Sequence, residues 1–289
     1  MSVKFGTFKG VFVPSTEAIL GTVLFLLMPV LIADVGLWAM LGVIVLAHSV
    51  TLATSFSIAD CATNLNNIGP GGMYALSRRS LGKALGGSIG FQLYLAQAAS
   101  IGFYSIGFAE PLRNIVIPML DFIPLFNQTD PASILLQKQL LGTFFFLIFF
   151  VIVMTGADFT LKIQTLILFV LGASIVAIII SPFFNITFEG DRVFGNGFNL
   201  TGNREITIAL FFMTFAQFFP AVCGIDAGIG MSGDLKNPRK SLVKGTFWAI
   251  GVTFILYILS AIVFSMMKKA TFEKRQPFCS LILTRSATG

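Results

Sequence analysis

The stretch Phe218-Phe-Pro-Ala-Val-Cys-Gly-Ile-Asp-Ala-Gly-Ile-Gly-Met-Ser-Gly-Asp234 decides the fold, because it interrupts an otherwise apolar run. Pro220 removes a helical N–H donor, and the glycines that follow have weak helix propensity. We therefore predict a helix break near Cys223 and Gly224. Glycines at four-residue spacing also serve close helix packing, which is the simpler alternative. The proline, the glycines and Asp226 together favour a functional break.

The composition of the chain is that of a membrane protein. Of 289 residues, 55% are apolar and 11% charged, and the mean hydropathy is +0.88. About a quarter of the residues in a soluble domain are charged, so the apolar excess must face lipid. Three irregularly spaced cysteines form neither a disulfide scaffold nor a zinc pattern, and we interpret His48 as a hydrogen-bonded packing residue.

Seven apolar runs are long enough to cross a bilayer, which takes about 20 residues each. We place them at about 12–32, 35–57, 86–109, 139–155, 160–182, 206–231 and 245–266. Residues 1–11 then form an N-terminal segment, 12–266 a transmembrane domain and 267–289 a separate tail. The first run is too long for a signal peptide and is expected to remain a span.

Basic residues set the orientation of these spans. With the N-terminus inside, the inner segments hold most of them, namely Lys4, Lys9, Arg78, Arg79, Lys83, Lys162, Lys236, Arg239, Lys240 and Lys244. The outer segments hold fewer, namely Arg113, Lys138, Arg192 and Arg204. The positive-inside rule predicts a cytoplasmic N-terminus, in a plasma membrane or a bacterial inner membrane. The basic tail from Lys268 conflicts with it, which indicates a further span or a non-native tail.

Two polar connections carry motif-like patterns. The outer segment contains two glycosylation patterns, Asn185-Ile-Thr187 and Asn199-Leu-Thr201, of a kind that often arises by chance. The inner segment 62–72 is rich in glycine but lacks the Lys-Ser/Thr ending of a phosphate-binding loop. We interpret it as a turn.

The first span contains a second candidate break. Gly21 and Thr22 lie near its middle, between Glu17 and Pro29, so residues 18–22 are expected to be non-helical. Two interrupted helices at corresponding positions are typical of transporters built from inverted five-helix repeats. A break exposes carbonyls that bind cations and N–H groups that bind anions.

Three side chains could take part in this binding. A charge at mid-bilayer costs about 2.5 to 3.5 kcal/mol, so Glu17 and Asp226 each need a reason to be there. Ion or proton coupling is one reason; capping by Asp226 and an interfacial position of Glu17 are the alternatives. Tyr104 presents its hydroxyl inward or makes an ordinary helix contact.

Several short motifs follow one another along the chain: Gly6-Thr-Phe-Lys-Gly-Val-Phe-Val-Pro14, Gly71-Gly-Met-Tyr-Ala-Leu-Ser-Arg-Arg-Ser-Leu-Gly82, Gly86-Gly-Ser-Ile-Gly90, Tyr104-Ser-Ile-Gly-Phe-Ala-Glu110 and Ser232-Gly-Asp-Leu-Lys-Asn-Pro-Arg-Lys-Ser241. Over residues 5 to 266 the chain resembles the cation-chloride cotransporters of the amino acid-polyamine-organocation superfamily. The resemblance implies an all-α, multi-pass bundle with the LeuT-type inverted-repeat fold and broken first and sixth helices. That fold has ten spans, so we expect a C-terminally truncated member with the first repeat and two helices of the second.

The resemblance implies ion sites at the breaks and no cofactor. The residues implied for potassium are Ala18, Ile19, Tyr104, Pro220 and Cys223. Those implied for two chloride sites are the backbone N–H groups of Gly21, Thr22 and Val23 and of Gly224, Ile225 and Asp226. The bound species would be Na⁺, K⁺, Cl⁻ or H⁺, as transported or coupling ions.

Three positions depart from the family's pattern. Ala18 replaces an Asn and Cys223 a Thr, which removes two oxygen ligands of a hard cation. Asp226 replaces an apolar residue beside a chloride site, where like charges about 4 Å apart repel by roughly 4 kcal/mol at an effective dielectric of about 20. An amino acid or polyamine permease, coupled to protons or cations through Glu17 or Asp226, therefore stands beside a cation and chloride symporter.

The predicted function is thus secondary transport by alternating access. The span count also suggests a receptor or retinal protein, but the seventh span has no internal Lys for a Schiff base, and receptors do not need two broken helices. No nucleophile, base and orienting group occur together, so no enzyme is predicted. The expected partners are the lipid bilayer, a small ion or amino acid substrate and a second copy in a homodimer, and no nucleic acid.

Overall fold

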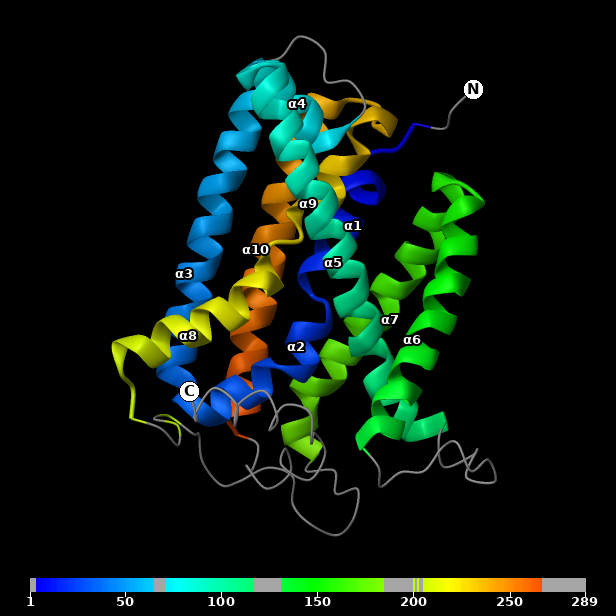
Figure 1. Ribbon diagram of the computed structural model, residues 1–289. Coiled ribbons are helices and arrows are strands. Elements are labelled where there is room, and N and C mark those ends of the chain that lie inside the picture. The colour runs from blue at the N-terminus through cyan, green and yellow to red at the C-terminus, as the bar shows by residue number, and fades with distance from the viewer. Residues whose placement is uncertain are drawn as a thin grey trace. The chain divides into compact units, whose positions relative to one another are not determined.

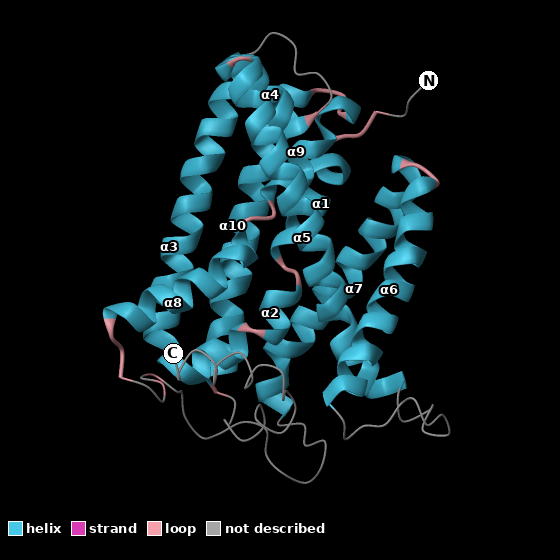
Figure 2. Ribbon diagram, viewed as in Figure 1, coloured by secondary structure: helices cyan, strands magenta, loops and turns pink. Residues whose placement is uncertain are grey.

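The computed structural model describes residues 4–64, 71–116, 131–184, 200, 202 and 205–266, and almost all of these residues are helical (Figure 2). The chain divides into two compact units, residues 1–72 with 164–289 and residues 73–163. The prediction of an all-α fold is confirmed. Two sequons, at Asn185 and Asn199, and the tail 267–289 lie outside the described residues.

Six helical segments in the described ranges are long and apolar enough to cross a membrane: Phe8–Leu26, Met28–Asn64, Ser133–Met154, Ala157–Pro182, Ile208–Asp234 and Pro238–Ser265. They coincide with six of the seven predicted spans. The third predicted span, 86–109, lies in helix α5 (Lys83–Val116), whose apolar run is interrupted by residues such as Gln92 and Gln97. Large apolar side chains such as Met154, 72% exposed, suit a surface that faces lipid.

The first unit holds both broken helices. In chain order its elements are η1 (Phe8–Phe12), α1 (Val13–Ile19), α2 (Thr22–Leu26), α3 (Met28–Asn64), α8 (Ile208–Phe218), η4 (Phe219–Val222), α9 (Ile225–Gly230), η5 (Met231–Asp234) and α10 (Pro238–Ser265). Helix α7 (Ala157–Phe184) runs into it from the second unit. Helices α3 and α10 pack side by side (Figure 1). The largest fully buried side chains of this unit include Tyr257, Phe218, Met40 and Ile44, so its core lies between α3, α8 and α10.

Helix α3 consists of two helical pieces separated at Gly36. The backbone of Gly36 has φ 80° and ψ 171°, a left-handed conformation that only glycine adopts readily. The predicted boundary between the first two spans lies near residue 34, within a few residues of this kink. The kink therefore lies close to the predicted boundary, but the first membrane-crossing segment ends earlier, at Leu26, and the second begins at Met28.

The second unit contains α4 (Gly72–Leu81) from its second residue on, α5, α6 (Pro131–Met154) and the start of α7. Helix α6 begins at Pro131, eight residues before the predicted start at 139. Arg113 lies in the last turn of α5 and Lys138 lies in α6, and their assignment to outer segments stays a prediction. Arg113 Nε donates to Gln137 Oε1 at 2.8 Å, and this bond between α5 and α6 keeps a buried polar side chain satisfied inside the helix.

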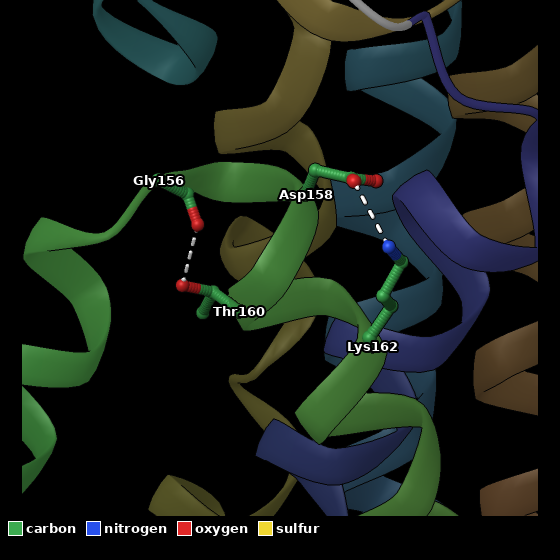
Figure 3. A network of polar contacts seen from close by, with 4 residues as sticks. All are labelled: Gly156, Asp158, Thr160 and Lys162. Atoms are coloured by element: carbon green, nitrogen blue, oxygen red, sulfur yellow. Dashed lines mark hydrogen bonds and ion pairs between the residues drawn. The ribbon is translucent and has the colours of Figure 1, made fainter.

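A tight turn joins α6 to α7. Gly156 has φ 118°, and the Thr160 hydroxyl donates to the Gly156 carbonyl at 3.0 Å (Figure 3). Lys162 Nζ lies 3.2 Å from Asp158 Oδ2 across one turn of α7. This ion pair is exposed, and such pairs contribute about 0.5 kcal/mol. The turn therefore depends on the glycine more than on the ion pair.

Replacing Gly156 with Ala should destabilise this turn by about 1 kcal/mol or more, because a Cβ disfavours positive φ. Thermal unfolding of the detergent-solubilised protein measures the effect. Gly172→Ala is the matched control, because Gly172 lies inside α7 with open space around its Cβ position. Alanine has the higher helix propensity there, so the control should keep or raise the unfolding temperature. Equal losses in both variants would contradict the strain at Gly156.

Candidate functional site at the two helix breaks

The first break lies between α1 and α2 (Figure 2). Leu20, with φ −82° and ψ 30°, ends α1, and Gly21, with φ −75° and ψ −153°, is extended. The predicted interruption within residues 18–22 is confirmed, but it is narrower, because Ala18 and Ile19 belong to α1 and Thr22 begins α2. The first N–H groups of a helix have no partner within it, so α2 presents the backbone of Thr22 and Val23 at the break.

The second break lies between η4 and α9. The α-helical turn tightens at Phe219, where Pro220 occupies the first turn of η4. Cys223 and Gly224, with ψ angles of 3° and 8°, then leave the helical path before α9 begins at Ile225. The Cys223 thiol donates to the Phe219 carbonyl at 3.3 Å. The predicted break near Cys223 and Gly224 is confirmed.

The two breaks touch each other. A Cβ placed on Gly224 would lie 2.6 Å from the carbonyl carbon and the Cβ of Ala18 and 2.6 Å from the Ile19 nitrogen. Only glycine permits this approach, because real side-chain carbons do not come so close to a backbone. The Ser15 hydroxyl also donates to the Ile225 carbonyl at 3.4 Å. The structure therefore brings four predicted site residues, including Ala18 and Ile225, into one place.

The predicted residues differ in their exposure. The side chains of Ile19, Val23 and Ile225 are buried, so their backbone atoms are the groups available for binding. Pro220 and Cys223 are exposed, and Gly21 and Gly224 are half-buried. The site is therefore mainly a backbone site, with Cys223 as an accessible side chain.

The two predicted acidic residues lie on different half-helices. Glu17, on α1, is half-buried, and its carboxyl group lies beside the backbone of Leu168 on α7. Its Oε1 atom is buried and has no hydrogen-bond partner among the described residues. Asp226 is half-buried in the first turn of α9. The carboxyl group of Glu17 thus faces α7.

Tyr104 belongs to the second unit. It lies on α5, where its ring makes a T-shaped contact with the ring of Phe103 at 5.8 Å. Its predicted inward-facing hydroxyl at the breaks stays a prediction.

Two residues at the breaks were missed by the sequence analysis. The Tyr257 hydroxyl donates to the Ile19 carbonyl at 2.7 Å, and the Thr51 hydroxyl donates to the Val222 carbonyl at 3.2 Å. Both side chains are buried, at 0% and 4% exposure. Their only signal in the sequence is an isolated hydroxyl residue inside an apolar span, and many ordinary helix residues share that signal.

His48 packs next to Tyr257. Its Nδ1 pairs with the Ile44 carbonyl at 2.9 Å, and its ring lies edge-on to the rings of Phe254 and Tyr257 at 5.0 and 5.6 Å. The predicted role of a hydrogen-bonded packing residue is confirmed. Within the described part of the chain, no three His, Cys, Asp or Glu side chains gather as a metal site.

An open apolar pocket lies between α2 and α7. It has a volume of about 580 Å³ and an almost wholly apolar lining, formed by Phe25, Ile167, Val170, Leu171, Ser174, Ala177 and Ile178. None of the predicted site residues lines it. The candidate site is therefore the junction of the breaks and not this cavity.

Membrane-spanning helices with two interrupted members in contact define the class of multi-pass transporters built on broken helices. The sequence profile of the amino acid permease family matches residues 10–271. The chain therefore belongs to the amino acid permease family. Family membership places it among transporters and not among enzymes, as the sequence predicts.

Curated relatives identify the branch of this family. The chain is 32% identical over 290 residues to vacuolar cation-chloride cotransporter 1 of Saccharomyces cerevisiae, covering 91% of the chain and 25% of that protein. It is 33% identical over 296 residues to solute carrier family 12 member 9 of Danio rerio, covering 89% and 31%. With solute carrier family 12 member 2 of Homo sapiens it shares 32% identity over 268 residues, covering 89% and 21%.

The chain thus spans only a fifth to a third of the length of these relatives. Its predicted resemblance to the cation-chloride cotransporters is confirmed.

Proposed function

We propose that the chain acts in secondary active transport, moving a cation and chloride across the membrane by alternating access, with the ions bound at the two breaks. The observation that carries this proposal is the contact of Gly224 with Ala18 and Ile19. It brings the carbonyl end of one interrupted helix next to the N–H end of the other, so one small volume offers both acceptors and donors. The similarity to cation-chloride cotransporters agrees with this chemistry.

The proposed cation ligands are backbone carbonyls at the first break and the Pro220 carbonyl. The proposed chloride donors are the N–H groups of Gly21 to Val23 and of Gly224 to Asp226. Hard cations prefer oxygen ligands and anions prefer backbone N–H groups, so each half of the junction suits one kind of ion.

An amino acid or polyamine permease coupled to protons or cations is the second candidate. Ala18 and Cys223 supply no hard oxygen ligand, and Asp226 places a negative charge where a second chloride would bind. A substrate amine would instead be attracted to Asp226 or Glu17. The matched family is itself described as amino acid permease.

The chain is an integral multi-pass membrane protein, and we propose that its N-terminus is cytoplasmic. The backbone of Phe5 pairs with the segment after the second broken helix, through Phe5 N to the Asp234 carbonyl at 2.7 Å and Lys236 N to the Phe5 carbonyl at 2.9 Å. This parallel bridge between Phe5 and Leu235 keeps the basic residues Lys4 and Lys236 near each other, which supports a common cytoplasmic side under the positive-inside rule. A plasma or bacterial inner membrane and a homodimer are also proposed.

Radiolabelled uptake into proteoliposomes separates the two candidates. Chloride, potassium, sodium and pH are varied one at a time, with protein-free liposomes as the control. Symport predicts that cation uptake requires chloride. Uptake that is indifferent to chloride but driven by a proton or sodium gradient, and competed by amino acids or polyamines, would support the permease instead.

A further inference from the structure

We propose that Tyr257 and Thr51 are positioning residues that hold the backbone of the two breaks. Each lies on the helix that follows one broken helix and donates a hydrogen bond to the other broken helix. Tyr257 lies on α10, which follows the second break, and binds the Ile19 carbonyl at the first break. Thr51 lies on α3, which follows the first break, and binds the Val222 carbonyl at the second. The two bonds therefore form a reciprocal pair.

The physical need for these bonds comes from the breaks themselves. Ile19 is the last residue of α1 and Val222 the last residue of η4. The last carbonyls of a helical segment have no partner within it, and a buried carbonyl without a partner is unfavourable, most of all inside a membrane. A hydroxyl from a neighbouring helix satisfies each carbonyl without continuing the helix.

The geometry makes the two donors rigid. Tyr257 is fully buried, and the rings of Phe218 and His48 lie edge-on to its ring at 5.2 and 5.6 Å. His48 lies on α3, one turn before Thr51. Helix α3 therefore bonds to the second break through Thr51 and packs through His48 against Tyr257, the donor to the first break. Thr51 shares its hydroxyl between the Val222 carbonyl and the Ala47 carbonyl of its own helix, at 3.2 and 3.3 Å.

The consequence for binding rests on the proposed function. A carbonyl oxygen has two lone pairs, so the Ile19 carbonyl can accept from Tyr257 and still face a cation. The hydroxyl then fixes the direction of the carbonyl without contacting the ion. Loss of the hydroxyl should therefore weaken the binding of the transported ion and change the rate of turnover much less.

Hydrogen–deuterium exchange of the full-length protein in detergent tests the positioning role without any transport measurement. Tyr257→Phe keeps the ring and removes the hydroxyl, and it should speed exchange several-fold in residues 16–24 but not in 219–230. Thr51→Val should do the reverse, and Thr51→Ser should restore slow exchange at the second break. Thr253→Val is the control, because within the described part of the chain the buried Thr253 hydroxyl bonds to Ala249 and Ile250 of its own helix and not to a break.

Transport gives the second readout. In Tyr257→Phe the KM for the transported ion should rise about tenfold, the effect of one lost hydrogen bond to a buried acceptor, while kcat changes by less than about twofold. Unchanged exchange at both breaks, or faster exchange at both in either variant, would overturn the proposal. If the wild-type protein transports no ion, the exchange measurement still decides the positioning role, so the two proposals fail separately.

Discussion

Gly224→Ala should lower transport at least about tenfold, because the added methyl group would lie 2.6 Å from the backbone of Ala18 and Ile19. Overpacking of this kind costs about 1 to 3 kcal/mol when neighbours can shift. Here the neighbours are backbone atoms of the other broken helix, so relief requires the two breaks to separate. Uptake per amount of reconstituted protein measures the loss.

Gly230→Ala is the matched control for this variant. Gly230 lies six residues further along the same broken helix, its φ of −54° suits any residue, and its Cβ position has open space around it. It should transport like the wild type. If Gly224→Ala also transports at the wild-type rate, close contact between the breaks is not needed for transport.

Asp226→Asn should strengthen the binding of chloride during transport. The carboxylate lies in the first turn of α9, where the proposed second chloride site requires a neutral residue. Two like charges about 4 Å apart repel by roughly 4 kcal/mol at an effective dielectric of about 20, so removal of the charge should lower the half-saturating chloride concentration at least tenfold. The measurement is cation uptake titrated with chloride at constant ionic strength.

The control for this charge removal is Asp234→Asn. Asp234 ends η5, after the same broken helix, and should leave the chloride titration unchanged. If Asp226→Asn instead abolishes coupling to a proton or sodium gradient without increasing chloride dependence, Asp226 binds a cation or an amine, as the permease hypothesis requires.

The positions of both breaks could be predicted from the sequence because their causes are local. Pro220 lacks an N–H, and Gly21 and Gly224 have weak helix propensity, so each break is caused by a few neighbouring residues. The kink at Gly36 also has a local cause, because Asp34 and Gly36 interrupt the apolar run.

The contact between the breaks could not be predicted in the same way. Gly224 meets Ala18 across about two hundred residues of chain, and a short sequence window carries no sign of that pairing. Tyr257 and Thr51 were missed for the same reason, since their acceptors are carbonyl groups, which every residue has. The start of α6 was placed too late because the predicted span covered only the apolar run, whereas the helix extends back over polar residues such as Gln137, which Arg113 of α5 satisfies.

The hydrogen bond from Tyr257 to the Ile19 carbonyl can form only late in the synthesis of the chain. The two residues are 238 positions apart, and a ribosome adds about 5 to 20 residues per second, so the first broken helix waits about 12 to 48 s for its donor. During that interval its open carbonyl sits in the translocon or the bilayer without its final partner. The first broken helix therefore reaches its final hydrogen bonding only after α10 has been synthesised.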